Sequence, residues 1–206
     1  FFLLPAESGA VAMKKVKGYT RGDRFKPLPG YKTFTSHYHV EHSLDFIEKQ
    51  GDGTGIPKGL ENPGFKQVFQ RMGVDIVHLA EFHRGRTPRL KTEQRLQQLK
   101  VMHDECERLS EPKFLLLPGE EPNVHLGGHW LSFFPKPVNW VLNRANGQPF
   151  MEEHPQYGKV YHVGSSADVL RLFKLEQGLN WTAHARIKGS TGYPDSYRDQ
   201  TFFQSD

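Results

Sequence analysis

The chain has 206 residues, of which 36% are hydrophobic and 12% aromatic, and its formal net charge is +4. This length can bury the core of one domain, and the aromatic content argues against intrinsic disorder. Lys and Arg are spread along the chain, so we expect no nucleic-acid surface. A single cysteine, Cys106, excludes an internal disulfide and a Cys-rich zinc site. No apolar run approaches the roughly 20 residues that span a bilayer, so we expect no membrane partner.

The first part of the chain differs in character from the rest. Residues 1–30 are rich in Gly, Lys and Pro and show little periodicity, and we interpret them as a lead-in segment or the tail of a preceding domain. The chain begins with Phe1 and not with Met, which favours a piece of a longer polypeptide. We expect residues 31–206 to form one domain, with a secreted or periplasmic location slightly favoured over the cytoplasm.

Strands and helices alternate along that domain. Tyr31 to Ser36 predicts a strand because it mixes β-branched and aromatic residues. Asn62 as N-cap, Pro63 in the first turn and Gly73 as stop predict the first helix. Further on, buried strands are expected over 74–83, 113–121, 129–134 and 179–185, and helices over 92–110 and 165–178. This order favours an α/β barrel or a layered sheet with parallel strands.

Histidines and carboxylates gather at the ends of the predicted strands, where α/β proteins place their chemistry. Four separate strands deliver such a group to the same end of the sheet, which scattered surface histidines would not do. The set consists of His37 and His39 after the first strand, Glu81 and His83 at the end of the second, Glu120 and Glu121 at the end of the third, His129 before the return strand, and His184 at the last.

These residue types in this pattern point to a metal site. Alternation along a strand sends both imidazoles of His37-x-His39 to one side, where they can reach one cation. Imidazole and carboxylate without thiolate suit zinc, manganese or iron. Glu121 is positioned to bridge two ions, whereas Glu120 is expected to face solvent or to support Glu121. The remaining histidines are interpreted as ordinary hydrogen-bonded or solvated residues: His78, His103, His125, His154 and His162.

Four short motifs, in this order, resemble the PHP (polymerase and histidinol phosphatase) domain family. They are "TSHYH", "LAEFH", "PGEEPNVHLGGH" and "TAHA". The phrase "WTAHARIKGSTGYPDSYRD" is most similar to the carbaryl-hydrolase-like CehA/McbA branch of that family. The resemblance runs from about Tyr31 to the end of the chain.

The resemblance implies a distorted (β/α)7 barrel with two or three divalent metal ions (Zn, Mn or Fe) at its C-terminal mouth. The expected ligands are His37, His39, His83, Glu121, His129 and His184, and the less certain ones His42, Asp45 and Glu81. The sequence departs from the family in three places. Glu81 stands two residues before His83, where the family has an Asp directly before its His, Ala185 replaces the family's Pro, and the closing Asp-x-His is absent. Either residues beyond Asp206 complete the barrel, or the last metal is poorly held.

The predicted function is metal-dependent hydrolysis of a small-molecule substrate by a metal-bound hydroxide. Arg84 and Arg186 follow metal-ligand candidates and are possible contacts for a substrate anion, which suits a phosphoester. The family branch favours a carboxylic ester, carbamate or amide, so the bond stays open. Two alternatives also stay open: an accessory metal-binding module with an incomplete site, and, from "HYHVEH", a metallo-β-lactamase-like hydrolase.

Overall fold

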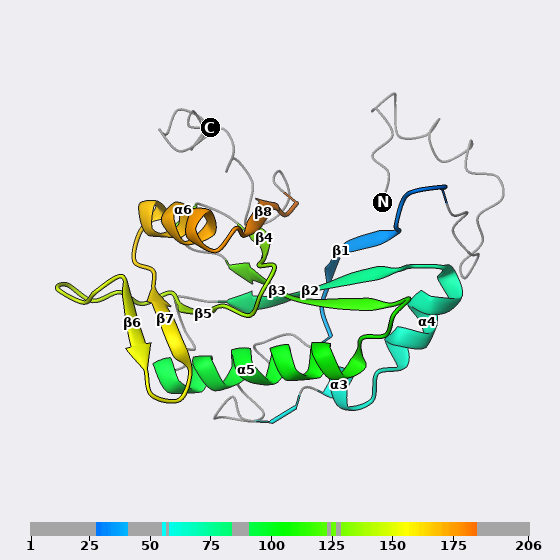
Figure 1. The fold of residues 1–206 in the computed structure, drawn as a ribbon, viewed down its shortest axis with the longest axis horizontal. Coiled ribbons are helices and arrows are strands. Elements are labelled where there is room, and N and C mark those ends of the chain that lie inside the picture. Colours follow the sequence, from blue (N-terminus) through cyan, green and yellow to red (C-terminus); the bar gives the residue numbers. More distant parts are fainter. Residues whose placement is uncertain are drawn as a thin grey trace.

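A computed structural model describes the chain over residues 28–40, 55–56, 58–83, 91–122, 125–126 and 129–184. The side chains of Lys58, Phe82 and His83 are not part of that description. Figure 1 shows two sheets with helices packed around them.

The larger sheet has five strands in the order β1-β2-β3-β4-β8. Strands β1, β2 and β3 are parallel, β4 runs antiparallel to β3, and β8 runs antiparallel to β4. Strand β8 therefore points in the same direction as the first three. The bounds are β1 Phe34–Tyr38, β2 Ile76–His83, β3 Leu115–Pro122, β4 Trp130–Phe133 and β8 Leu179–Thr182.

This sheet is curved into a half-barrel. The rings of Phe34 in β1 and Trp181 in β8 lie 6.3 Å apart although these strands form opposite edges of the sheet. The described residues show this open five-stranded arrangement and no closed barrel, so the (β/α)7 barrel expected from the family resemblance stays a prediction.

A second, three-stranded sheet follows β4 in the chain and was not expected from the sequence. Its order is β5-β7-β6, with β5 parallel and β6 antiparallel to β7. The strands are β5 Asn139–Val141, β6 Met151–His154 and β7 Gly158–His162. Trp140, Phe150 and Tyr161 from this region share a hydrophobic core with Leu172 and Phe173 of α6.

Four helices are described: α3 Lys58–Glu61, α4 Gly64–Met72, α5 Thr92–Leu109 and α6 Ser166–Leu175. The expected N-cap of α4 is wrong by one residue, because Pro63 occupies that position. Gly73 ends α4 as expected, in the left-handed conformation that glycine adopts without strain. Ser165 is the N-cap of α6, and its Oγ accepts a hydrogen bond from the Asp168 amide. No described helix is long and apolar enough to cross a bilayer.

The long helix α5 covers the outer face of the half-barrel (Figure 1). The helical spacing of Leu96, Leu99, Met102, Cys106 and Leu109 places them on one face of α5, and all five are buried. Met102, Cys106 and Leu109 pack against Val77, Leu79 and Leu116 of β2 and β3. Burial raises the pKa of the Cys106 thiol well above its usual range, which fits a core residue and not a nucleophile.

The inner face of the half-barrel carries an aromatic layer toward the amino ends of the strands. The His78 ring from β2 lies 5.4 Å from the rings of Phe133 and Trp181, and the latter two are 5.7 Å apart. The same layer includes Phe34, three residues before His37 in β1. These rings fill the half-barrel below the level at which the candidate metal ligands lie.

Candidate metal centre

The topology of the larger sheet explains why ligand candidates from distant parts of the chain meet. Because β1, β2, β3 and β8 point the same way, their carboxyl ends lie at one edge of the sheet. Strand β4 is antiparallel, so its amino end lies at that same edge. His37, Glu121 and His184 come at or just after strand ends, and His129 comes just before β4, so all four arrive at one place.

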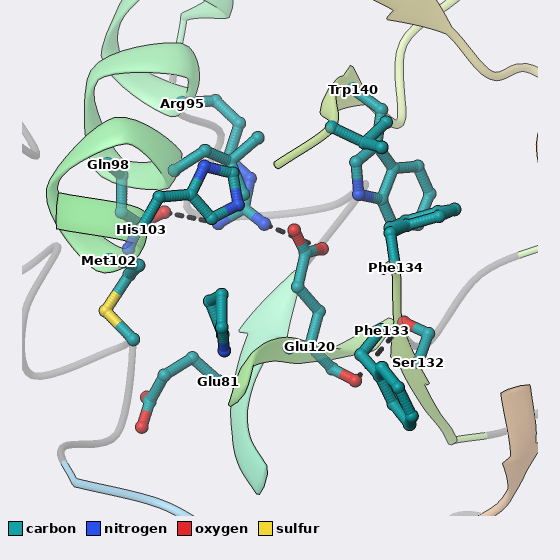
Figure 2. A pocket seen from close by; sticks show the side chains of 14 residues that line it. Glu81, Arg95, Gln98, Met102, His103, Glu120, Ser132, Phe133, Phe134 and Trp140 are labelled. Carbon is teal, nitrogen blue, oxygen red and sulfur yellow. Dashed lines mark hydrogen bonds and ion pairs between the residues drawn. The ribbon is translucent and has the colours of Figure 1, made fainter. Parts of the chain in front are cut away.

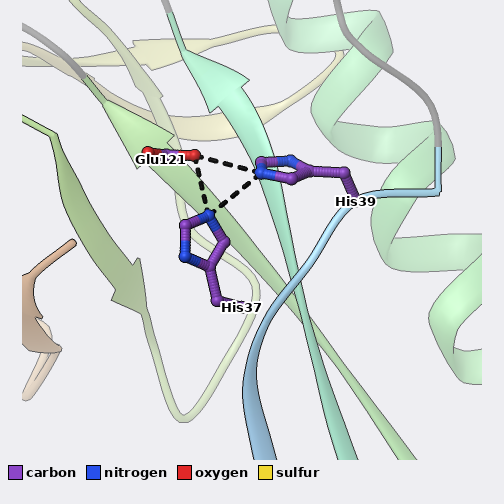
Figure 3. Close-up of side chains that lie close together, drawn as sticks. All are labelled: His37, His39 and Glu121. Atoms are coloured by element: carbon purple, nitrogen blue, oxygen red, sulfur yellow. Dashed lines mark hydrogen bonds and ion pairs between the residues drawn. The ribbon is translucent and has the colours of Figure 1, made fainter. Parts of the chain in front are cut away.

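Glu121 lies at the centre of the cluster and is 1% exposed. One of its carboxylate oxygens, Oε2, lies 3.1 Å from His37 Nε2 and 3.1 Å from His39 Nε2. The two imidazole nitrogens are themselves 3.0 Å apart, so the three atoms form a nearly equilateral triangle (Figure 3).

The other oxygen, Oε1, serves a second pair of histidines. It lies 2.7 Å from His129 Nδ1 and 3.0 Å from His184 Nε2. The backbone also joins this pair, since the Ala183 amide donates to the His129 carbonyl across 2.9 Å. One carboxylate thus has two imidazoles on each oxygen.

The electrostatics of Glu121 follow from these contacts. Burial raises the pKa of its carboxyl, but the imidazole hydrogen bonds from His37, His39 and His129 outweigh burial and hold the net pKa well below the usual range. The carboxylate is therefore ionised at neutral pH.

The donor geometry fits a divalent ion. Donor atoms held at about 2.0–2.1 Å by one ion lie about 3.3 Å apart in a tetrahedral site and about 3 Å apart in an octahedral one. The distances between His37, His39 and Glu121 fall at this scale. A second triad shares Glu121: the donor atoms of Glu121, His129 and His184 lie within 4.8 Å of one another.

The proton arrangement of the cluster also favours a cation. If His37 and His39 both directed an N–H at Oε2, their protons would crowd each other across the 3.0 Å between the nitrogens. A cation in contact with the lone pairs of both rings removes that conflict and moves each ring proton to the other nitrogen.

Glu81 and Glu120 lie on the opposite, outer face of the sheet. Glu120 is 7% exposed and forms an ion pair of 2.8 Å with Arg95 of α5, so the expectation that it faces solvent is wrong. Both carboxylates line a pocket between α5 and the sheet, together with Arg95 and His103 (Figure 2). Consecutive residues of a strand point to opposite faces, which separates Glu120 from Glu121.

The structure does not bring Glu81, one of the less certain ligand candidates, into the histidine cluster. Its Oε1 instead accepts a hydrogen bond of 2.7 Å from the Val40 amide, one residue after His39. Its role at this edge of the sheet is therefore to contact the backbone beside a ligand.

Several expected site residues lie outside the part of the chain that the structure describes. His83 ends β2, and its backbone is paired with Pro122 of β3, but its side chain is not described. His42 and Asp45, and the two candidate anion contacts Arg84 and Arg186, are not described at all. Their proposed roles stay predictions.

His78 agrees with its interpretation as a hydrogen-bonded residue: it is fully buried, with its ring nitrogens 2.7 and 3.1 Å from the carbonyl oxygens of Ser36 and Ser132. Sequence reasoning missed one residue, on the outer face of the sheet. Arg95 was overlooked, although its spacing of four from Leu99 and seven from Met102 puts a charge on the buried stripe of α5. A charged residue on an apolar stripe was the signal that could have found it.

Comparison with known proteins returned nothing: no family model, no curated protein and no solved structure matches this chain. The PHP-like motifs therefore remain a resemblance.

Proposed function

We propose that this chain is a metal-dependent hydrolase that cleaves an ester-type bond in a small-molecule substrate, with Glu121 bridging two divalent ions. The observation that carries the proposal is that each oxygen of the Glu121 carboxylate faces a different pair of histidines. Oε2 faces His37 and His39, and Oε1 faces His129 and His184.

The chain's own residues account for how such a centre would be held. Glu121 supplies one buried negative charge between the two positions, and this charge lowers the repulsion between two cations. The four imidazoles supply neutral donors, which suit zinc, manganese or iron. When bound, such ions supply Lewis-acid activation of water and of a substrate oxygen.

The histidines of the cluster are partly exposed to solvent, whereas Glu121 is buried. The side chains of His37, His39, His129 and His184 are 22–30% exposed, whereas Glu121 is 1% exposed. A small molecule can therefore approach the histidine side of the cluster while the bridging carboxylate stays shielded. Attack on the substrate is assigned to this exposed side, and no serine or cysteine nucleophile is required.

The test combines metal analysis with turnover. Purified protein is dialysed against zinc or manganese and analysed for bound metal, and then assayed with 4-nitrophenyl phosphate and 4-nitrophenyl acetate. The proposal expects two or three ions per chain and turnover of at least one of the two substrates. The matched variant Glu121→Gln should lose both metal and turnover.

Each alternative result has a clear meaning. Less than one ion per chain and no turnover of either substrate would contradict the proposal. Full metal loading without turnover of esters, amides or phosphoesters would instead support the accessory metal-binding module. The substrate that is turned over assigns the bond class, which the described part of the structure leaves between phosphoester and carboxylic ester.

A further inference from the structure

Strand β1 departs from regular pairing where it carries the first two histidines. Thr35 pairs with Val77 of β2, and Tyr38 pairs with Leu79. The step from 35 to 38 covers three residues in β1, whereas the step from 77 to 79 covers two in β2, so β1 contains one extra residue. Such a bulge redirects side chains next to a functional site, but it also interrupts the ladder that would hold the backbone in place.

Two side chains of β2 contact the backbone at β1, one within this interruption and one just beyond it. His78 Nδ1 lies 2.7 Å from the carbonyl oxygen of Ser36, the residue before His37. Glu81 Oε1 accepts a 2.7 Å hydrogen bond from the amide of Val40, the residue after His39. His78 belongs to the inner aromatic layer and Glu81 to the outer pocket, so the contacts come from opposite faces of the sheet.

Both side chains are themselves held firmly. His78 is 0% exposed, packs against Trp181 and Phe133, and lies with Nε2 3.1 Å from the Ser132 carbonyl. Glu81 is 7% exposed and lines the pocket that holds Arg95. A rigid support of this kind is what a metal ligand needs, because donor atoms must stay within about 0.5 Å of their productive positions.

We propose that His78 and Glu81 are positioning residues that fix the backbone around His37 and His39, so that both Nε2 atoms converge on Glu121 Oε2. This inference rests on the proposed metal centre and concerns one half of it. The other half is built differently, because β4 and β8 pair regularly from Trp130–Thr182 to Phe133–Leu179 and the Ala183–His129 backbone bond extends that ladder.

The asymmetry gives the inference a specific consequence. Loss of either positioning contact should weaken the ion held by His37 and His39 and leave the ion held by His129 and His184 in place. Removing the support of a metal ligand typically lowers metal affinity about 10- to 100-fold. A merely structural role would lower the melting temperature without separating the two ions.

The experiment compares Glu81→Ala with Glu81→Gln by zinc titration against a chromophoric chelator, with bound zinc counted after dialysis. A glutamine keeps an oxygen that accepts the Val40 N–H, whereas alanine has none. We expect Glu81→Ala to weaken one zinc ion about 10- to 100-fold and to change the other less than about threefold. Glu81→Gln should keep both affinities within about threefold of wild type.

His78→Phe provides an independent variant in case Glu81→Ala does not fold. Phenylalanine fits among the surrounding rings but removes the donor to Ser36, and the same loss of one ion is expected. Wild-type affinity for both ions in every variant would overturn the inference, as would equal loss in Glu81→Gln and Glu81→Ala. If wild-type protein binds no zinc, the proposed function itself fails, and that result is distinct from all of these.

Discussion

Strand β3 places two neighbouring glutamates in two different environments. Glu120 and Glu121 are 7% and 1% exposed, yet Glu120 meets the permanent cation of Arg95, whereas Glu121 meets four imidazoles. A guanidinium stays charged and neutralises its partner within the chain. Imidazoles can donate to a carboxylate and can also serve as metal ligands, so the surroundings of Glu121 suit a cation as well. The nature of the partners, and not the depth of burial, separates a structural carboxylate from a candidate ligand.

The largest expected effect concerns exchange of the two carboxylates for amides. Glu121→Gln should lower zinc affinity at both positions by about 100-fold or more, because it removes the shared charge and replaces one of the two donor oxygens by an NH2 group. Glu120→Gln should leave zinc affinity within about threefold. Chelator competition titration measures both, and loss of zinc in Glu120→Gln alone would reverse the assignment of the two faces.

The substitution Glu120→Gln, on the outer face of the sheet, should instead lower the free energy of unfolding. Glu120→Gln leaves Arg95 buried without its anion, and breaking a buried pair costs about 3–5 kcal/mol in free energy of unfolding. Burial already lowers the pKa of Arg95, and Glu120 opposes that shift. In the double variant Glu120→Gln/Arg95→Met, part of the loss should be recovered, since no unpaired charge remains. Urea unfolding of the two single variants and the double variant measures the coupling between Glu120 and Arg95. Strictly additive losses of unfolding free energy would show that these two residues are not coupled.

A steric test addresses the inner face. A Cβ on Gly119 would lie 1.8 Å from His78 Nε2 and 2.7 Å from the Ser132 carbonyl oxygen. Gly119→Ala should therefore displace the His78 ring and cost about 1–3 kcal/mol in free energy of unfolding. Gly64→Ala in α4 is the control, because a Cβ there meets nothing within 4 Å, and its effect should stay within about 0.5 kcal/mol. Equal stability of the two variants would mean that the His78 ring is not fixed in place.

The smallest expected effect is a pH dependence from His78. Burial lowers the pKa of its imidazole, more than the contacts with the Ser36 and Ser132 carbonyls raise it. The unfolded chain therefore binds a proton at higher pH than the folded protein does. The stability from neutral His78 is complete above about pH 6.5 and is lost as the pH falls toward the depressed folded pKa. Urea unfolding of wild type and His78→Phe between pH 5 and 8 measures this contribution of His78. If the free energy of unfolding changed with pH by the same amount in both proteins, the prediction would be contradicted.

The sequence was sufficient to find most of the cluster but not its surroundings. His37, His39, Glu121, His129 and His184 were found because strand direction alone brings strand ends to one edge. Contacts across elements follow no local period, so the pairing of Arg95 with Glu120 and of Glu81 with Val40 needed three-dimensional structure.

The second sheet was not predicted from the sequence, for a different reason. Its strands are three to five residues long, and stretches such as "MEEH" and "NWV" are too short or too polar to show an alternating pattern. Tertiary packing decides their conformation, since Trp140, Phe150 and Tyr161 join the core formed with α6. The Asn62 cap was assigned from residue preference alone, and the helix begins one residue later than that preference indicates.

The central claim, that one carboxylate joins two metal positions, is tested most directly by counting zinc in single-ligand variants. His39→Ala and His184→Ala each remove a donor from a different oxygen of Glu121. After equilibrium dialysis and elemental analysis, each variant should contain one zinc ion fewer than wild type, and the double variant two fewer. Loss of all zinc in either single variant, or no loss in both, would contradict two positions sharing Glu121.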